Sequence, residues 1–225
     1  MDRRANIHHG CLYLVLSEAY GNGRNLLDIA RLAIAGGVDL LQMREKDKSP
    51  QALLTLGTAL SRLCRDKGVI FIVNDNPRLA VELDADGVHM GQEDLLACGV
   101  DKVRHIVGPH RMIGVSTHNP GQFQKALAWD VDYLAFGPVF QTRTKDYHIG
   151  TEAIDYILSI TSKPVFFIGG IKTSNLDILI DKGATNVALI RDIMEAKHVD
   201  QRARWYKRKL RGQRGFSAVC DGAAY

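Results

Sequence analysis

Two aspartates that follow short apolar runs are the residues of this chain that point most directly to chemistry. The run Val69–Val73 ends in Asn74 and Asp75, and the run Gly87–His89 is followed closely by Asp94. Parallel α/β folds place active-site residues at the carboxyl ends of strands, so we expect both carboxylates at one edge of a sheet. Mg²⁺ prefers carboxylate and phosphate oxygens. The pattern therefore predicts a Mg²⁺ site, held by Asp75 and Asp94, that handles a phosphate compound.

Each of these signals also has a plainer interpretation. Asn-Asp is a common turn pair, and the sequence Gln92–Asp94 suits the start of a helix. A lone histidine such as His89 at a strand end is as often packed in the core as it is catalytic. We interpret His89 as a ligand contact rather than a proton carrier.

A cluster of cations follows the run that begins near Val38. Strand alternation puts Gln42, Arg44 and Lys46 on one side. Arginine offers a planar fork for phosphate oxygens and lysine a compact charge, so the three residues suit a diphosphate. A surface charge run that opens a helix is the alternative, and the position at a strand end favours the anion site.

Later runs end in further polar residues. Ser116 directly follows the fifth apolar run, Met112–Val115. Its hydroxyl suits either a helix cap or a ligand contact, and the sequence does not decide between them. The loop after the sixth apolar run, Tyr133–Phe136, contains Thr142, Thr144 and Lys145. An anion-binding loop and a solvated loop are equally good interpretations of this segment.

Glycines and the two residues at the end of the last run complete the candidate site. Gly170, second of two glycines after the seventh run, permits close approach of backbone N–H groups to phosphate, with a tight turn as the alternative. The eighth run leads to Ile190 and Arg191. In many barrels the loops after strands seven and eight bind phosphate. We therefore expect a second phosphate site there.

The elements that would position these residues recur along the chain. Segments with helical spacing separate the apolar runs and cover 26–35, 51–67, 121–129, 152–159 and 176–182. Asn119-Pro120 and Thr173–Asn175 are typical of helix starts. The expected strands are Cys11–Leu16, Val38–Gln42, Val69–Val73, Gly87–His89, Met112–Val115, Tyr133–Phe136, Pro164–Ile168 and Asn186–Ile190.

This alternation predicts an α/β fold, a (β/α)₈ TIM barrel. The near-continuous apolar character of the runs is typical of a parallel sheet buried on both faces. An open doubly wound sheet is the rival, but the chain lacks an early G-x-G-x-x-G signature.

Composition limits the class of protein. The 225 residues are 46% hydrophobic and 24% charged, which predicts one barrel domain over residues 1–212 and a loose tail over 213–225. No run of about 18 apolar residues and no secretory signal is visible, so we expect a cytoplasmic protein without membrane contact. The four scattered cysteines indicate reduced thiols rather than a zinc site or a disulfide frame.

Charge is unevenly spread along the chain. Residues 197–225 hold eight Lys or Arg and two Asp, a net +6, so residues 1–196 sum to 4 − 6 = −2. Basic terminal helices more often present a solvated face than a nucleic-acid surface, so nucleic-acid binding is not expected. The sequence leaves a homo-oligomer open.

The joint order of these motifs resembles the thiamine phosphate synthase family, also called thiamine-phosphate pyrophosphorylase, from about Leu12 to Met194. Any one motif is modest, and their order together is specific. The segments that carry the resemblance are Gln42–Lys46, Val73–Asp75, Ala85–Asp94, Gly114–His118, Asp132–Tyr133, Gly137–Phe140, Thr142–Lys145 and Ile168–Ile171.

The resemblance implies a transferase on a (β/α)₈ barrel. It would condense 4-amino-2-methyl-5-hydroxymethylpyrimidine diphosphate with hydroxyethylthiazole phosphate, through dissociative loss of diphosphate. It also implies Mg²⁺ on Asp75 and Asp94, His89 near the pyrimidine, and charge stabilisation of the leaving group by Arg44, Lys46 and Lys145. The pyrimidine diphosphate would be held by Gln42, Arg44, Lys46, Asn74, Ser116 and Lys145, and the thiazole phosphate by Thr142, Thr144, Gly170, Ile190 and Arg191.

Two positions depart from the family pattern, and two other functions compete. Asn76 stands where the family usually has Arg, and Arg191 stands where it often has Ser. A thiazole tautomerase on the same barrel tends to lose the Asp94 region and to carry His where Pro138 stands, so the synthase is preferred. A phosphate-ligand sensor without catalysis has no need of a leaving-group metal.

Overall fold

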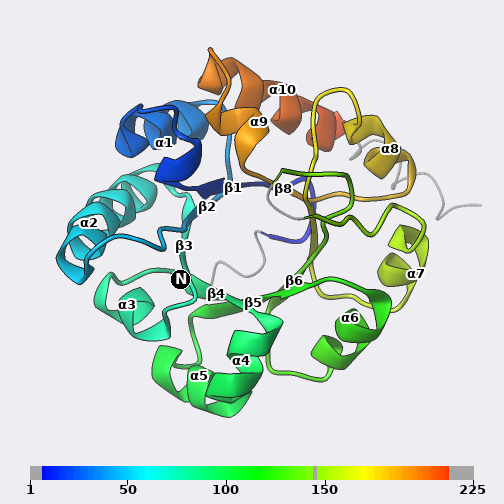
Figure 1. Ribbon diagram of the computed structural model, residues 1–225, viewed down its shortest axis with the longest axis horizontal. Coiled ribbons are helices and arrows are strands. Elements are labelled where there is room, and N and C mark those ends of the chain that lie inside the picture. Colours follow the sequence, from blue (N-terminus) through cyan, green and yellow to red (C-terminus); the bar gives the residue numbers. More distant parts are fainter. Residues whose placement is uncertain (1–6, 144–145, 213–225) are drawn as a thin grey trace, which may run out of the picture.

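Eight parallel strands form a closed barrel in this computed structural model, which describes residues 7–143 and 146–212 (Figure 1). Each strand pairs with the next along the chain, and β8 pairs with β1. This confirms the predicted (β/α)₈ barrel. The strands are β1 Leu12–Leu16, β2 Leu40–Met43, β3 Ile70–Asn74, β4 Gly87–Gly91, β5 Met112–Thr117, β6 Tyr133–Phe136, β7 Val165–Ile168 and β8 Val187–Leu189.

Strand alternation divides the buried side chains into two clusters. Leu12, Leu14 and Leu16 of β1 pack in the larger cluster, between the barrel and its helices. Tyr13 belongs to the smaller cluster, which fills the barrel interior with residues such as Phe166 of β7. Because both faces of each strand are buried, the strands read as continuous apolar runs.

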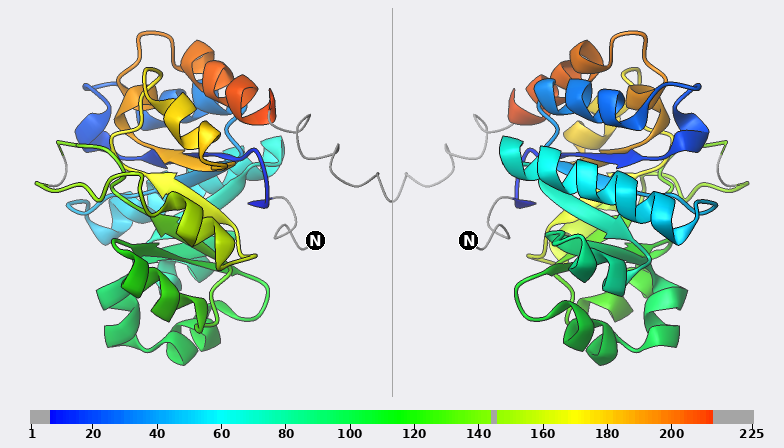
Figure 2. Two further views of the ribbon diagram at one scale, coloured as in Figure 1. Left: turned by 90° about the vertical axis from the view of Figure 1, so that its right-hand side faces the viewer. Right: turned by 90° about the vertical axis from the view of Figure 1, so that its left-hand side faces the viewer.

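Helices surround the barrel on all sides, as the end-on and side views show (Figures 1 and 2). A short 3₁₀ helix, Glu18–Tyr20, follows β1. The α-helices are α1 Leu26–Ala35, α2 Pro50–Lys67, α3 Pro77–Glu82, α4 Gln92–Cys98, α5 Val100–Val107, α6 Pro120–Leu127, α7 Ile154–Ser159, α8 Leu176–Asp181, α9 Arg191–Met194 and α10 Val199–Arg211.

Three of these helices begin with the same local device. Proline occupies the first turn of α2, α3 and α6, where its missing N–H costs no hydrogen bond. The residue before each proline, Ser49, Asn76 or Asn119, accepts a hydrogen bond from a backbone N–H of the first turn. The predicted helix start at Asn119-Pro120 is therefore confirmed.

The short helices α3, α5 and α9 were not predicted from the sequence, and for α4 only the start was considered, because Gln92–Asp94 suits a helix start. Their length of 4 to 8 residues does not by itself explain this, because α6, α7 and α8 have 6 to 8 residues and were predicted. Element ends also shift by a residue or two. The strand expected from Val38 begins at Leu40, for example, and the helix expected from Glu152 begins at Ile154.

The basic segment that follows α9 packs on the barrel as α10, beside α1 (Figure 1). Lys207 is 6% exposed, and its Nζ donates to the Gly10 carbonyl at 2.6 Å and to both Asp39 carboxylate oxygens at 2.6 and 2.7 Å. Arg202 and Tyr206 both donate to one Asp192 oxygen, at 2.6 and 2.7 Å. These cations pair within the molecule, which corrects the expectation of a purely solvated face.

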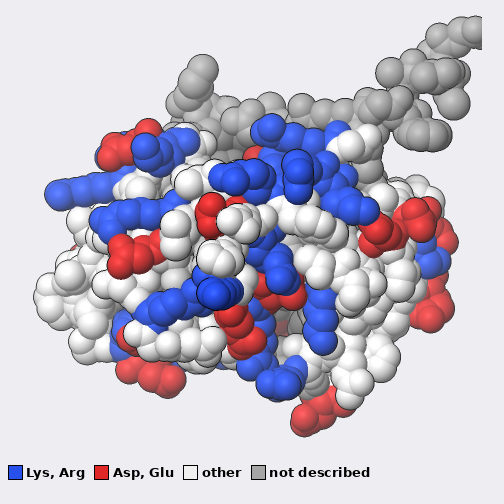
Figure 3. All heavy atoms as spheres, turned by 90° about the horizontal axis from the view of Figure 1, so that it is seen from above, with Lys and Arg blue, Asp and Glu red and all other residues white. Residues whose placement is uncertain are grey.

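Lys and Arg still gather on the outer side of this region, with Asp and Glu between them (Figure 3). No described helix has the length and apolar character needed to cross a membrane. The predicted loose tail over 213–225 falls outside the described residues.

Candidate active site

A cavity of about 860 Å³ lies at the carboxyl ends of the strands. This is the end at which barrels of this type place their chemistry. The loop after β6, which contributes to the cavity, lies at the opposite end of the barrel from the segment that leads into β1 (Figure 2). Predicted site residues that line the cavity are Arg44, Lys46, Asn74, Asp75, His89, Asp94, Ser116, Thr142, Gly170, Ile190 and Arg191.

Asp75 is placed by an unusual backbone conformation. Its φ is +57°, in the left-handed region, which Asp tolerates better than most residues with a side chain. Its N–H donates to the His89 carbonyl at 2.8 Å, which extends the pairing of β3 with β4 by one residue. The amide Nδ2 of Asn74 donates to Asp75 Oδ2 at 2.6 Å, and the backbone N–H of Gly91 donates to Asp75 Oδ1 at 3.3 Å. The carboxylate is thus oriented from two sides.

Asp94 reaches the same glycine from the first turn of α4. Its Oδ2 lies 2.8 Å from the point that a Cβ on Gly91 would occupy, so a side chain at that position would displace the Asp94 carboxylate. Asp75 and Asp94 therefore meet at Gly91, and both are exposed to the cavity.

Two carboxylates that approach the same glycine and border one cavity are ligands that suit a hard divalent cation. In the described part of the chain, no group of three or more His, Cys, Asp and Glu side chains lies together. Mg²⁺ usually takes one or two carboxylates and fills its octahedron with water and substrate phosphate. The donor set of Asp75 and Asp94 therefore suits Mg²⁺ bound together with a phosphate ligand better than a zinc site.

The three residues predicted to face one anion lie at different depths. Arg44 is half-buried and Lys46 is exposed, and both line the cavity. Gln42 is 3% exposed and is not among the cavity-lining residues, because it lies a layer deeper, in register with Ile72. Its Nε2 donates to Tyr13 Oη at 2.6 Å. Two cations therefore face the cavity, and the amide is buried below them.

His89 lies between the cavity and the barrel interior. Its Nδ1 is 3.1 Å from Tyr133 Oη and its Nε2 is 2.8 Å from Ser116 Oγ. Burial lowers the pKa of His89 to about 4, because the interior disfavours the charged imidazolium. The ring is therefore neutral near pH 7. This state agrees with a ligand contact better than with a proton carrier.

Glycines bring the loops after β6 and β7 together on the opposite wall. A Cβ on Gly137 would lie 2.0 Å from the Ile168 carbonyl oxygen, and one on Gly170 would lie 2.4 Å from the Gln141 carbonyl oxygen. Gly170 also has a φ of +65°. The tight turn considered from the sequence is thus present, and the same turn lines the cavity. Thr142 lies on this wall, and Thr144 and Lys145 fall outside the described residues.

Arg191 lines the cavity and is held there by two neighbours that line it as well. Its Nε donates to Glu195 Oε1 at 2.7 Å, and its guanidinium carbon lies 5.2 Å from the centroid of the Tyr20 ring. Asn76 is the other residue that differs from the family pattern. It caps α3 by accepting a hydrogen bond from the Leu79 N–H at 2.9 Å. Arg191 and Asn76 therefore each contact neighbouring residues that fix their side chains.

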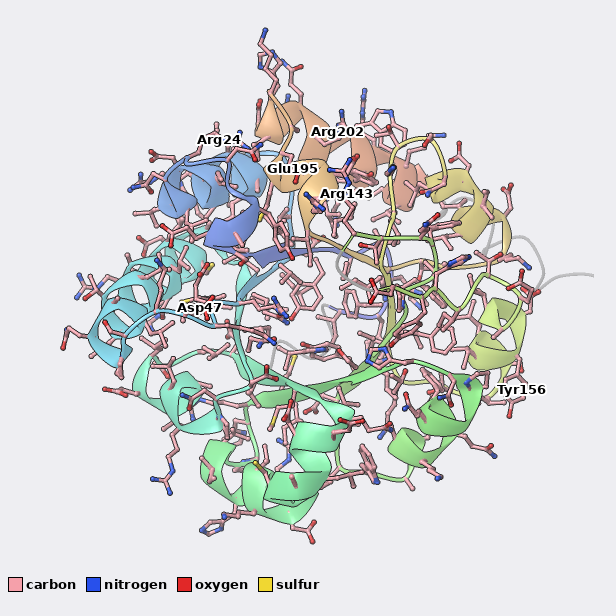
Figure 4. All side chains as sticks on the ribbon, viewed as in Figure 1. Arg24, Asp47, Arg143, Tyr156, Glu195 and Arg202 are labelled. Carbon is pink, nitrogen blue, oxygen red and sulfur yellow. The ribbon has the colours of Figure 1, made fainter. Side chains whose placement is uncertain are left out.

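Several cavity residues were not singled out from the sequence. His118 follows the fifth strand, and its Nδ1 lies 2.6 Å from the Gly137 carbonyl oxygen. Arg143, on the loop after β6, and Glu195, at the end of α9, also line the cavity (Figure 4). The sequence could have indicated His118, because it lies two residues after Ser116. It could also have indicated Arg143, because that residue lies in the basic loop after β6. Glu195 follows α9, and no pattern in the sequence indicated that it would line the cavity.

Comparisons with known proteins identify the family. The family model described as thiamine monophosphate synthase matches residues 12–193. A thiamine-phosphate synthase of Nostoc sp. is 42% identical over 201 residues, which cover 87% of this chain and 54% of the relative. One of Lawsonia intracellularis is 36% identical over 194 residues, which cover 85% of this chain and 88% of the relative. The chain thus spans about half the length of the Nostoc relative.

A solved structure is similar over nearly the whole chain. The thiamine phosphate pyrophosphorylase of Pyrococcus furiosus superposes with a TM-score of 0.81 at 28% identity, over 93% of this chain and 98% of that one.

Proposed function

The chain belongs to the thiamine monophosphate synthase family, and we propose that it joins 4-amino-2-methyl-5-hydroxymethylpyrimidine diphosphate to hydroxyethylthiazole phosphate. One observation carries the proposal. Asp75 and Asp94 meet at Gly91 in the same cavity as Arg44 and, on the opposite wall, Gly170. A cavity with a cation site on one side and a glycine-lined wall on the other suits two phosphorylated substrates better than one.

The residues around Asp75 would bind the pyrimidine diphosphate. Asp75 and Asp94 would hold Mg²⁺, which when bound draws negative charge from the diphosphate and makes it a better leaving group. Arg44 and Lys46 line the adjacent wall and would neutralise the same charge, with Lys145 from the loop after β6. The remaining contacts to this substrate would come from Asn74 and Ser116, with His89 beside the pyrimidine. Gln42 is buried below the cavity with its amide on Tyr13, so it would support this wall rather than touch the substrate.

The bond changes need no protein nucleophile. The C–O bond to the diphosphate breaks with both electrons leaving on oxygen, and the electron-rich aminopyrimidine stabilises the methylene cation. The thiazole nitrogen then donates its lone pair to that carbon. The role of the chain is to hold both partners in line and to stabilise the departing charge.

The opposite wall would hold the thiazole phosphate. Gly170 and the Ile190 and Arg191 backbone line the cavity there. Thr142 would contribute a hydroxyl, as would Thr144. Since Arg191 is held by Glu195 and Tyr20, its charge would lie at the rim of the phosphate site rather than fill it.

The two competing functions are not favoured. A thiazole tautomerase tends to lack the Asp94 region and to carry His at the position of Pro138, and both Asp94 and Pro138 line the cavity here. A sensor without catalysis has no use for a metal at a leaving group. We place the reaction in the cytoplasm, since its phosphorylated substrates do not cross membranes unaided.

A direct assay tests the proposal. Incubation of the purified chain with both phosphorylated precursors and Mg²⁺ should form thiamine phosphate, and prior removal of Mg²⁺ with EDTA should abolish it until Mg²⁺ is restored. Binding of both precursors without product at saturating Mg²⁺ would show that the chain is not a synthase.

A further inference from the structure

We propose that Tyr13 and Tyr133 are positioning residues that fix the direction of a chain of hydrogen bonds from Gln42 to His89, so that the Ser116 hydroxyl donates into the cavity. The direction of the chain follows from the Gln42 amide as first donor and from the need of each buried hydroxyl hydrogen for an acceptor. Its use in selecting an acceptor atom of the substrate rests on the proposed function.

The chain of hydrogen bonds crosses the barrel interior in four steps. Gln42 Nε2 lies 2.6 Å from Tyr13 Oη, and Tyr13 Oη lies 3.0 Å from Tyr133 Oη. Tyr133 Oη lies 3.1 Å from His89 Nδ1, and His89 Nε2 lies 2.8 Å from Ser116 Oγ. The first residue is buried in the barrel, and the last lines the cavity.

Packing holds both phenol rings in these positions. Tyr13 and Tyr133 are 1% and 0% exposed, and each makes an edge contact with Phe166, at centroid distances of 5.3 and 5.4 Å. Tyr133 also stacks on His89 at 5.5 Å and 29°. A Cβ on Gly114 would lie 2.1 Å from Tyr133 Cζ, so only glycine at that position leaves room for the ring. The two hydroxyls have little freedom to find other partners.

The direction follows from how many hydrogens each group has. An amide nitrogen only donates, so Tyr13 Oη accepts from Gln42, and among the described residues its single hydrogen then finds an acceptor only on Tyr133 Oη. Tyr133 then gives its hydrogen to His89 Nδ1. A neutral imidazole has one N–H, so it lies on Nε2 and donates to Ser116 Oγ. The Ser116 hydroxyl hydrogen is left for the cavity.

This direction decides which ligand atom Ser116 can meet. A hydroxyl that already accepts from His89 presents a donor, which suits a phosphate oxygen or an unprotonated ring nitrogen. The reverse direction would present a lone pair, which suits an amino group. The inference therefore assigns an acceptor atom of the pyrimidine diphosphate to Ser116.

Nitrogen NMR on the full chain tests the direction without any substrate. The chain has eight histidines, so the His89 signals are identified by their loss in His89→Asn. We expect an imidazole with its proton on Nε2 and an unprotonated Nδ1 near pH 7. A proton on Nδ1 in the unaltered protein would overturn the proposal, and this measurement needs no folded variant of either tyrosine.

Substitution of one phenol tests its positioning role. In Tyr133→Phe, His89 Nδ1 loses its donor, so we expect both tautomers to appear and the KM for the pyrimidine diphosphate to rise about five- to tenfold, with a smaller change in kcat. Tyr156→Phe, an exposed tyrosine on α7, is the control and should change neither quantity. An unchanged tautomer and KM in Tyr133→Phe would contradict the proposal. If the chain shows the expected His89 tautomer but forms no thiamine phosphate, only the proposed reaction is contradicted.

Discussion

Asp75 shows how a single residue combines backbone geometry with chemistry. Its left-handed φ of +57° and its N–H bond to the His89 carbonyl place the carboxylate over the cavity, and the Asn74 amide orients it. Non-glycine residues in this region of φ are uncommon and concentrate at functional sites. The conformation at Asp75 therefore orients its carboxylate toward the cavity, which its proposed role as a metal ligand requires.

Removal of either cavity carboxylate should nearly abolish turnover. We expect Asp75→Asn and Asp94→Asn each to lower kcat by several powers of ten, because the leaving diphosphate would lose its metal. Glu93→Gln, the exposed neighbour of Asp94 that does not line the cavity, is the matched control and should remain active. Initial rates at saturating substrate measure the effect. Full activity in both aspartate variants would refute the metal assignment.

The buried His89 should make the fold sensitive to acid. Its pKa is lowered to about 4, so between the ordinary value near 6.5 and about 4 the unfolded chain binds a proton that the folded chain does not. The free energy of unfolding should thus fall by up to about 3 kcal/mol as the pH drops through this window. Urea titrations of the unaltered protein and of His89→Asn at pH 7 and pH 4 measure the difference. An equal loss of unfolding free energy in the two proteins would show that His89 is not the source of the acid sensitivity.

At the scale of elements, α10 stabilises the barrel from outside. Val199, Ala203, Tyr206 and Leu210 belong to the cluster between barrel and helices, and Lys207 ties the helix to Asp39 and Gly10. The basic composition of this segment thus serves the fold, at least in part.

Loss of the Lys207 charge should destabilise the fold without changing the site. In Lys207→Met the Asp39 carboxylate keeps, among the described residues, only its bond from the Leu12 N–H, so we expect a cost of about 2 to 4 kcal/mol. Lys209→Met, whose pair with Asp177 is exposed, should cost less than about 1 kcal/mol. Chemical denaturation compares the two variants. Equal stability in both would mean that the Lys207 pair contributes nothing.

Truncations separate α10 from the residues beyond it. A chain that ends at Gly212 should keep its activity and melting temperature. A chain that ends at Ala196 loses α10, exposes the apolar face of α1 and β1, and should not fold cooperatively. Circular dichroism melts and product formation measure both. Loss of activity in the chain that ends at Gly212 would show that residues 213–225 contribute to the enzyme.

At the scale of the whole molecule, the sequence predicted the barrel and the location of the site for a common reason. Each strand is buried on both faces and appears as an apolar run, so the polar residues that end the runs, such as Asn74 and Asp75, had to gather at one end of the barrel. The family resemblance then identified the chemistry.

Other features depend on contacts between distant residues. Tyr13 and Tyr133 read as ordinary core aromatics, because alternation shows that a residue faces the interior but not which hydroxyl it meets. The position of the Arg191 side chain depends on Tyr20 and Glu195, which lie on different elements. Short helices such as α9 have too few turns to show a period.

The central claim is that one cavity couples departure of diphosphate to capture by the thiazole nitrogen. The most direct measurement quantifies thiamine phosphate and diphosphate in the same quenched reaction with both substrates and Mg²⁺. The account predicts that the two products appear in equal amounts and that neither appears when the thiazole phosphate is replaced by buffer over the same interval. Diphosphate without thiamine phosphate, or conversion of the thiazole substrate alone, would contradict it.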